Sequence, residues 1–296
     1  MNQIQPQRIT TIPKLAPRPT HSNKGMYGHV LVVAGSRPYT GAPTLTANAA
    51  LRSGAGLVTL AVPDVIQQTV MGLCPCATSL VLDSDATGGL AESACSQVMQ
   101  ALERISVLAV GPGMGTQAGA TQMVRALLAQ ELPVVLDADG LNNLLKIDDW
   151  PALRQCPLVL TPHPGEFSRM TGQGVADIQA SRESSALSAV GQWLSRSQCP
   201  QPLVLVLKGE GSVVTDGRRV FINSSGNPGM ATGGTGDVLT GVIAALIAQH
   251  LEPFDAACLG VHVHGRSGDL AAEPIGQVSM IATDLIDFLP EAFKQA

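Results

Sequence analysis

The chain contains few aromatic residues and few charges for its length. Of its 296 residues, 3% are aromatic and 14% are charged, whereas 45% are hydrophobic. So much apolar material with so little charge excludes an intrinsically disordered chain. With few aromatics available, Val, Leu, Ile and Ala must build the core, which suits a parallel sheet packed under helices of small residues.

Other absences narrow the class further. The net charge of −5 and the isoelectric point near 5.6 argue against non-specific nucleic-acid binding. No apolar run reaches the length of a transmembrane helix, and the longest, Val238–Ala248, has the length of a buried helix. The N-terminus is polar and rich in proline, without the apolar core of a signal peptide. We therefore expect a cytoplasmic protein with neither a nucleic-acid nor a membrane partner.

The cysteines follow no metal-binding or redox pattern. None of the six forms a CxxC pair or a zinc-ligand spacing, and Cys74 and Cys76 form only a CxC. Free, buried thiols are the expectation for a cytosolic protein.

The length fits one large α/β unit, and neither an internal repeat nor a linker divides it. Residues 1–24 carry four prolines and are predicted to form an irregular N-terminal arm, which leaves 25–296 as a single catalytic domain.

Short apolar runs rich in Val and Leu alternate with longer helical patterns. This alternation predicts right-handed βαβ units and a mainly parallel sheet. The predicted buried strands are His29–Ala34, Leu57–Val62, Val107–Val110, Pro133–Leu136, Leu158–Leu160 and Leu203–Leu207, and the predicted helices between them are Ala42–Ser53, Gly119–Gln130 and Asp177–Arg196.

The remaining elements lie in the C-terminal third. Ser212–Thr215 and Arg218–Ile222 flank an Asp-Gly turn and predict a hairpin at an antiparallel edge of the sheet. Three helices should follow: one with an apolar stripe running from Val238 to Ile247, then Phe254–Ala272 and Ala282–Ala292.

Five of the predicted strands run directly into a polar or glycine-rich motif. Because parallel strands end at a common edge, and ligands of open α/β sheets bind outside the carboxyl ends, these motifs predict a ligand site. They are Gly35–Ser36, GPGMG (111–115), DADGLN (137–142), TPHPGE (161–166) and KGEG (208–211).

The segment Asn227–Asp237, NPGMATGGTGD, is the sharpest signal for function. Its glycines let the backbone approach a ligand, and a helix that begins near Gly236 offers free N–H groups to an anion. The backbone of Gly234, Thr235 and Gly236 would hold a transferred phosphoryl group, while Asp237 would take a proton from a substrate hydroxyl. The alternative is a glycine-rich turn in which Asp237 is a plain helix cap.

Side chains at the other strand ends supply the rest of the predicted site. Lys208 follows a buried strand and is expected to contact phosphate. Glu166 and Asp137 are candidates for holding Mg²⁺ through water, with a helix-cap or turn role as the alternative for each. His163 lies between two prolines and is expected to face a ligand, whereas His262 and His264 are expected to pack or to be partly exposed.

In their order along the chain, these motifs resemble the ADP-dependent (S)-NAD(P)H-hydrate dehydratases, members of the ribokinase-like superfamily. The resemblance runs from about Lys24 to the C-terminus. It rests on KGMYGHVLVVAGS (24–36), YTGAPTLTANAALRSGAGLVTLAVP (39–63), GPGMG, DADGLN, TPHPGEFSRM (161–170), LKGEGSVVTDG (207–217) and NPGMATGGTGDVLTGVIAAL (227–246). It implies a three-layer α/β/α sandwich and the repair of hydrated NADH and NADPH (NADHX and NADPHX), with ADP consumed and AMP and phosphate released.

The resemblance also implies roles for single residues. Asp237 would be the catalytic base. The hydrate would contact Ala42, Gly113, His163 and Asp237, and the AMP part of the nucleotide would contact Lys208, Gly209, Glu210, Gly211, Ser212 and Gly236. Mg²⁺ and a homotetramer are further expectations. In many bacteria an epimerase domain precedes the dehydratase, and because the 24-residue arm is too short to hold one, the epimerase is expected on a separate chain.

Two other functions stay open at this point. A ribokinase-like kinase of a vitamin alcohol such as hydroxyethylthiazole would use the same glycine segment, although GPGMG together with HPGE favours the dehydratase. A nucleotide-binding regulator without catalysis is the third reading, and Asp237 beside the anion site argues against it.

Overall fold

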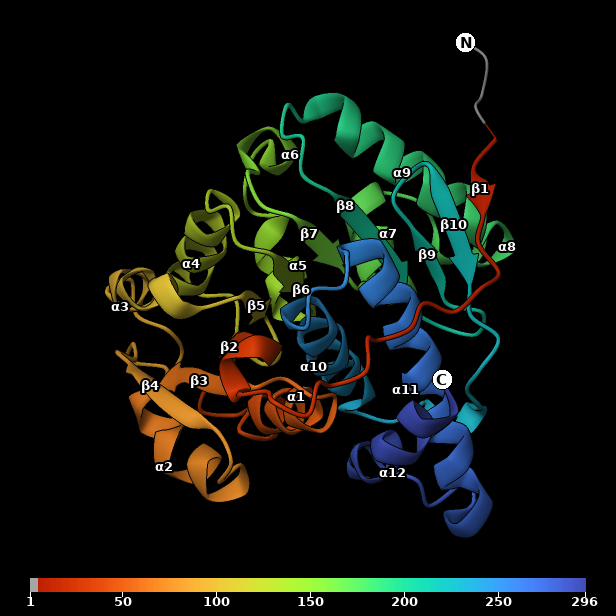
Figure 1. Cartoon of the computed structure of the whole chain (residues 1–296). Helices are drawn as coiled ribbons and strands as arrows, with labels where there is room; N and C mark the ends of the chain where they lie inside the picture. The colour runs from red at the N-terminus through yellow and green to blue at the C-terminus, as the bar shows by residue number, and fades with distance from the viewer. Residues whose placement is uncertain (1–4) are drawn as a thin grey trace.

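A ten-stranded sheet forms the middle layer of the chain in the computed structural model, which describes residues 5–296 (Figure 1). The strand order is β1-β10-β9-β8-β7-β6-β5-β2-β3-β4. The strands from β8 to β4 run parallel, β9 is antiparallel to both of its neighbours, and β1 pairs in parallel with β10. Their bounds are β1 Gln7–Arg8, β2 His29–Val33, β3 Leu57–Pro63, β4 Thr78–Leu82, β5 Val107–Val110, β6 Val134–Leu136, β7 Leu158–Leu160, β8 Leu203–Leu207, β9 Val213–Thr215 and β10 Arg219–Ile222.

Helices cover both faces of the sheet (Figure 1). One layer consists of α1 Gly41–Arg52, α2 Asp64–Leu73, α10 Thr235–Ala248, α11 Pro253–Ile275 and α12 Ala282–Gln295. The other consists of α3 Ala94–Ala101, α4 Ala118–Leu128, α5 Asp139–Leu144, α6 Trp150–Leu153, α7 Pro164–Thr171, α8 Val175–Ala180 and α9 Arg182–Arg196. Three 3₁₀ turns complete the described elements: η1 Lys24–Tyr27, η2 Leu102–Arg104 and η3 Pro228–Met230.

The two faces of each strand contribute to separate halves of the core. In β2, Val30 and Val32 pack under α1 and α10, whereas Leu31 and Val33 pack under the opposite layer. This follows from the alternation of side chains along a strand. Because helices cover both faces of the sheet, the strands are continuous apolar runs in the sequence. The predicted three-layer fold with a mainly parallel sheet is confirmed.

The predicted strands and hairpin all appear, with ends shifted by at most one residue. The hairpin differs in one respect, because β1 pairs with β10 and takes the outermost position in its place. That short strand lies in the arm predicted to be irregular; residues 1–4 of the arm are outside the described residues.

The prediction of one helix over Asp177–Arg196 is wrong, because the helix is interrupted at Ser181. Ser181 has φ −145° and ψ 45°, and its hydroxyl donates to the Asp177 carbonyl. A serine hydroxyl can compete in this way with backbone N–H groups for a helix carbonyl. The result is two helices, α8 and α9, in place of one.

The elements α2, β4 and α3 were not predicted from the sequence. Strand β4 is the last in the sheet, and most of its residues are partly or fully exposed, so it lacks the apolar run that marks the buried strands.

Helix α10 is buried on all sides. The apolar stripe predicted from Val238 to Ile247 is only part of its contact surface, because every residue from Val238 to Ala248 is buried. Helix α1 packs along one side of α10, and both helices contact the sheet. A methyl group on Gly241 would lie 2.1 Å from the Thr46 carbonyl oxygen of α1, so the two helices pack backbone to backbone.

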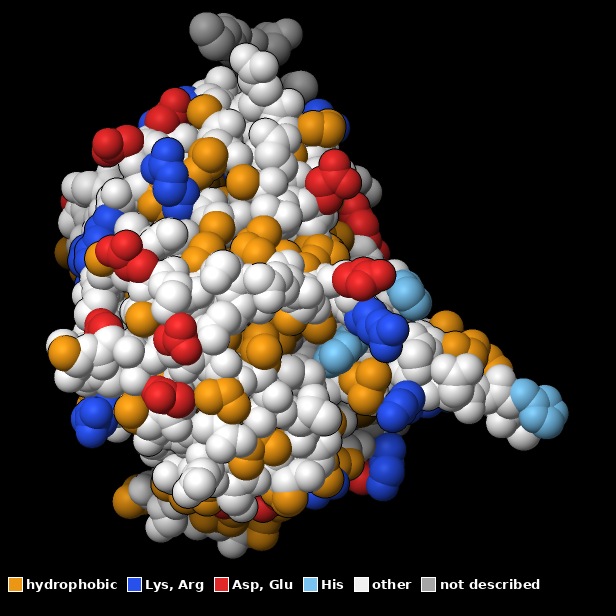
Figure 2. All heavy atoms as spheres, turned by 90° about the vertical axis from the view of Figure 1, so that its left-hand side faces the viewer, with side chains coloured by type: hydrophobic (Ala, Val, Ile, Leu, Met, Phe, Trp, Pro, Cys, Tyr) orange, Lys and Arg blue, Asp and Glu red, His pale blue; other side chains and the backbone are white. Residues whose placement is uncertain are grey.

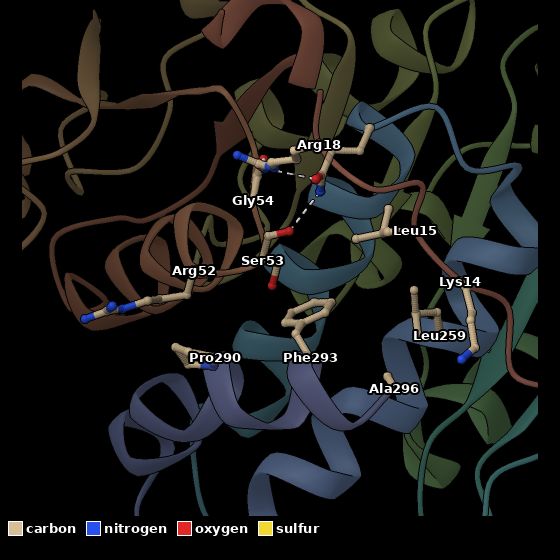
Figure 3. A pocket seen from close by; sticks show the side chains of 11 residues that line it. Lys14, Leu15, Arg18, Arg52, Ser53, Gly54, Leu259, Pro290, Phe293 and Ala296 are labelled. Carbon is tan, nitrogen blue, oxygen red and sulfur yellow. Dashed lines mark hydrogen bonds between the residues drawn. The ribbon is translucent and has the colours of Figure 1, made fainter. Parts of the chain in front are cut away.

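The N-terminal arm crosses the ends of α1 and α10 (Figure 3). Arg18 donates to the Gly54 carbonyl and to the Gln249 side chain, and its guanidinium lies 3.8 Å from the centre of the Tyr27 ring. A cation at two helix C-termini offsets their partial negative charge. A hollow of about 340 Å³ lies between this part of the arm and Phe293 of α12.

The surface carries a mixture of side-chain types, and the cysteines form no disulfides among the described residues. Acidic, basic and apolar side chains are interspersed over the face of α2, α3 and α4 (Figure 2). Among residues 5–296, no helix is both long and apolar enough to cross a membrane. All six cysteines are free as predicted, but Cys76 is exposed and Cys199 only partly buried.

The contact between α1 and α10 can be tested with two helical glycines. Gly241→Ala should lower the free energy of unfolding by about 1–3 kcal/mol, because the new methyl group meets backbone that cannot move aside. Gly191→Ala is the matched control: Gly191 is exposed in α9 with open space around it, so alanine should raise stability by roughly 0.5–1 kcal/mol. Urea unfolding measures both, and equal midpoints for Gly241→Ala and the parent would contradict the packing.

Candidate active site

A cleft of about 1150 Å³ opens at the carboxyl ends of β6, β7 and β8. The N-terminus of α10 and one side of α11 form its other walls. Of the residues predicted for the site, it is lined by His163, Glu166, Asp137, Lys208, Gly209, Glu210, Gly211, Ser212, Gly234, Thr235, Gly236 and Asp237. The sheet edge therefore brings together three of the predicted motifs and the glycine segment.

A buried ion pair ties three of these walls together. Lys208 Nζ at the end of β8 lies 2.6 Å from Asp137 Oδ1 at the end of β6, and the Thr240 hydroxyl of α10 donates to Asp137 Oδ2 at 2.8 Å. The Asp137 side chain is 1% exposed. Both carboxylate oxygens are thus engaged by protein groups, and the next residue, Ala138, is held at φ 50°, a strained value typical of functional sites.

The charge of Lys208 is stabilised although it is buried. Burial by itself would lower the pKa of Lys208, but the attraction of Asp137, Glu166 and Asp237 outweighs this effect and raises it. The lysine stays protonated and provides a fixed positive charge in the cleft, as a phosphate contact requires.

Gly236 lies directly beside this ion pair. A methyl group on Gly236 would be 3.1 Å from Lys208 Nζ and 3.5 Å from Asp137 Oδ2. Glycine therefore lets the first turn of α10 approach the charged pair. Gly234, at φ 92°, caps the helix in the left-handed region, where a side chain is unfavourable.

Asp237 lies in the first turn of α10 and lines the cleft. Burial raises its pKa from 3.8 to about 7, helped by repulsion from Asp137 and opposed by the charge of Lys208. A carboxyl group that titrates near neutral pH is suited to act as a general base there. The alternative of a plain helix cap does not fit, because Gly234 is the capping residue.

His163 and Glu166 form the N-terminal cap of α7. His163 Nδ1 accepts from the backbone N–H of Gly165 and Glu166, and Glu166 Oε2 accepts from the N–H of His163 at 2.8 Å. The proton of the neutral ring is therefore on Nε2, which lies 3.5 Å from Glu166 Oε1. The cap locks His163 in place, and its side chain remains 53% exposed at the cleft.

The environment of Glu166 resists ionisation. Burial raises its pKa, Lys208 acts in the opposite direction, and Asp137 adds repulsion. The helix-cap role left open for Glu166 is present, and its second oxygen faces the histidine ring.

The loop Lys208–Ser212 presents backbone to the cleft. Gly209 and Gly211 have φ values of 138° and 59°, and the Ser212 hydroxyl donates to the Gly209 carbonyl. Arg182 of α9 supports the loop from behind, because its Nη2 donates to the carbonyls of Leu207 and Lys208 at 2.8 and 3.2 Å. This supporting arginine was not predicted from the sequence, because it lies about 25 residues before the loop in the chain.

Ala42 and Gly113 lie beside each other but do not line the cleft. A methyl group on Gly113 would be 3.3 Å from Ala42 Cβ and 2.5 Å from Tyr39 Cβ. The GPGMG motif is tied to the next strand end by Asp139, whose Oδ2 accepts from the Gly115 N–H at 3.0 Å. The two predicted substrate contacts thus form a neighbouring patch on the same sheet edge.

Sequence reasoning missed the contribution of α11. His264 was expected to pack or to be partly exposed, and it is partly exposed; it also lines the cleft, where its Nε2 lies 2.9 Å from the Thr235 carbonyl oxygen. Asp269 of the same helix accepts from the Gly226 N–H and the Asn227 amide. A histidine at every second position, as in His262 and His264, gave no indication of which one would face the site.

The residues present do not form a metal cage of their own. Among the described residues, no group of three or more His, Cys, Asp or Glu side chains is placed to hold a metal ion. Mg²⁺ commonly keeps several waters and binds through one or two carboxylates and substrate phosphates. Glu166 fits that partial role, whereas Asp137 is already occupied by Lys208 and Thr240.

Known proteins resemble this chain in both sequence and fold. A family model described as NAD(P)H-hydrate dehydratase matches residues 30–291. A bifunctional NAD(P)H-hydrate repair enzyme from Moorella thermoacetica is 43% identical over 284 residues, which cover 95% of this chain and 52% of that protein. The chain thus spans about half the length of the curated relatives it matches.

Solved structures agree with this family. An ADP/ATP-dependent NAD(P)H-hydrate dehydratase from Bacillus subtilis, co-crystallised with ATP and Mg²⁺, is 31% identical with a TM-score of 0.80 and covers 95% of this chain and 94% of its own. A ribokinase-like superfamily protein from Enterococcus faecalis is 25% identical with a TM-score of 0.79, covering 95% and 92%. By the family model and by these relatives, the chain belongs to the NAD(P)H-hydrate dehydratase family, within the ribokinase-like fold.

Proposed function

We propose that this chain dehydrates the S-epimer of hydrated NADH and NADPH in an ADP-dependent reaction that returns NAD(P)H and releases AMP and phosphate. The observation that carries the proposal is the position of Asp237. A carboxyl group with a pKa raised to about 7 lies in the same helix turn as the backbone of Gly234–Gly236, at the N-terminus of α10 and beside Lys208.

The reaction follows from these groups in two steps. Asp237 takes the proton of the ring hydroxyl, whose oxygen attacks the terminal phosphorus of ADP and breaks its bond to AMP. Phosphate then leaves with the electrons of the ring C–O bond, while the adjacent ring carbon loses a proton and a C=C bond forms. The backbone N–H groups at the start of α10 stabilise the charge on the transferred phosphoryl group.

The nucleotide fits the opposite wall of the cleft. Lys208–Ser212 offers backbone and one ammonium group for the AMP part, with Gly236 between the two ligands. The Bacillus subtilis relative was co-crystallised with ATP and Mg²⁺, which supports nucleotide use in this family. Mg²⁺, when bound with the nucleotide, neutralises phosphate charge, and Glu166 would hold it through water. His163, with Ala42 and Gly113 in the adjacent patch, would contact the hydrate.

The assembly and partners of the chain belong to the same proposal. We expect a homotetramer, and an epimerase activity that supplies the S-epimer. The curated relatives are named bifunctional repair enzymes and are about twice as long, which supports a second activity acting on the same metabolite.

The function is tested by following reduced nicotinamide absorbance with NADHX, Mg²⁺ and either ADP or ATP. We expect NADH to be restored, with one AMP and one phosphate formed for each NADH when ADP is the nucleotide. Hydroxyethylthiazole serves as the competing substrate. No recovery of NADH together with a stable phosphorylated thiazole alcohol would replace the dehydratase by a kinase.

Removing the base should stop turnover while nucleotide binding remains. Asp237→Asn should lower kcat by about 10²- to 10⁴-fold, the usual contribution of a general base. Affinity for AMP should be equal or slightly higher, because one negative charge has left the site. Asp287→Asn, at an exposed position in α12, is the matched control and should react at the parent rate.

If Asp237→Asn is at least as stable as the parent, its loss of kcat is not caused by unfolding. Below the ordinary carboxyl pKa of 3.8, the folded and unfolded forms both keep the proton. As pH rises towards about 7, only the unfolded form ionises freely, so the native state loses stability. The asparagine variant should therefore melt at an equal or higher temperature at pH 8. A full parent rate in this variant would refute the base role.

The pH profile should show the titration of Asp237. Because the base acts only when it is ionised, kcat/KM should fall about tenfold for each pH unit below about 7 and level off above it. The residual rate of Asp237→Asn should lack this acidic limb, which separates Asp237 from the titration of nucleotide phosphates. An identical limb in both proteins would assign the titration to another group.

A further inference from the structure

Residues 262–269 of helix α11 pack behind residues 225–235, the glycine-rich wall of the cleft. Asp269 Oδ2 accepts from the Gly226 N–H at 3.0 Å, and Asp269 Oδ1 accepts from the Asn227 amide at 3.2 Å. The Ser225 hydroxyl donates to the His262 carbonyl at 2.9 Å. Residues 225–227 and α11 therefore form one hydrogen-bonded unit, so a displacement of α11 would also move the backbone that leads into the cleft wall.

The contact between them is too close for side chains at two positions. A methyl group on Gly265 would lie 2.2 Å from Ser225 Oγ, and one on Gly268 would lie 2.4 Å from Met230 Sδ. The glycines bring the helix axis near to residues 225–230, which places His264, the residue directly before Gly265, within reach of the start of α10.

His264 makes the last contact of this series. It directly precedes the close-packed Gly265, is partly exposed to the cleft, and its Nε2 is 2.9 Å from the Thr235 carbonyl oxygen. Because a carbonyl can only accept, Nε2 carries the proton and donates it to Thr235. The imidazole thus holds one peptide group in the first turn of α10.

That peptide group is the one that ends in the Gly236 N–H. In a planar trans peptide the C=O and the N–H point in opposite directions, so a bond that fixes the Thr235 carbonyl also fixes the direction of the Gly236 N–H. Gly236 has no side chain to restrict its backbone, and it lies beside Lys208. An external hydrogen bond is the means by which such a residue can be preorganised.

We propose that His264 is a positioning residue for the anion-binding backbone: its hydrogen bond to Thr235 aims the Gly236 N–H at the phosphates of a nucleoside diphosphate. This assignment rests on the proposed nucleotide-dependent function and adds to it a residue that does not touch the substrate.

The histidine acts through its geometry and not through charge. Burial lowers the pKa of His264 to about 4, with the bond to Thr235 acting in the opposite direction and the charge of Lys208 adding to the effect of burial. The ring is therefore neutral at neutral pH. A neutral amide donor of similar reach should replace it, which separates positioning from electrostatics.

The experiment compares the affinities of the full chain for ADP and for adenosine by calorimetry. In His264→Leu we expect ADP binding to weaken about tenfold, as for the loss of one buried hydrogen bond, with adenosine binding changed by less than about twofold. His264→Gln should restore most of the ADP affinity. His262→Leu is the matched control on the same helix, outside the cleft lining, and should bind both ligands as the parent does.

Several outcomes would overturn the assignment. Equal losses for ADP and adenosine would mark His264 as a structural residue, and unchanged ADP binding in His264→Leu would remove its role. A glutamine variant as weak as the leucine variant would show that the donor is not the cause. His264→Phe, which keeps the ring volume, takes the place of the leucine variant if that protein does not fold.

Failure of the proposed function is distinguishable from failure of this assignment. A parent protein that binds ADP but does not restore NADH from NADHX would refute the dehydratase, while the ADP-to-adenosine comparison would still decide the role of His264. A parent protein that binds no ADP would overturn both.

Discussion

The active-site end of the fold depends on the ion pair between Lys208 and Asp137. It joins the end of β8 to the end of β6, and Thr240 adds α10 to the same carboxylate. Breaking such a buried pair by removing one partner commonly costs about 3–5 kcal/mol, because an uncompensated charge remains inside the protein. The pair therefore links the ends of two strands that lie on either side of β7 to the start of the glycine-rich helix.

The same pair determines the charge balance of the cleft. One ammonium group faces Asp137, Glu166 and Asp237. Burial, together with repulsion from Asp137, raises the pKa of Asp237, whereas the attraction of the three carboxylates outweighs burial and raises the pKa of Lys208. Lys208 alone does not balance these carboxylates, so phosphates would also need backbone N–H groups and an accompanying cation. The start of α10 supplies the first, and the absence of a complete metal cage among the described residues fits a cation that arrives with the nucleotide.

Much of the fold could be read from the sequence, because buried parallel strands are continuous apolar runs and Asp-Gly marks a hairpin. The exceptions have local causes. Strand β4 is exposed at the end of the sheet and so has no apolar run, and α8 and α9 are separated by a serine hydroxyl that competes for a helix carbonyl. His264 could not be recognised because its partner, Thr235, lies 29 residues away in the chain.

The sequence by itself determined the layers, the buried strands, and which motifs follow strand ends, since these depend on periodicity and on glycine and proline positions within short segments. Only the tertiary structure decided which motifs share the cleft. Asp137, His163, Lys208 and Asp237 meet there, whereas Gly113 lies in the adjacent patch. It also decided that Asp237 titrates near pH 7, because a pKa depends on burial and on charges brought together from distant parts of the chain.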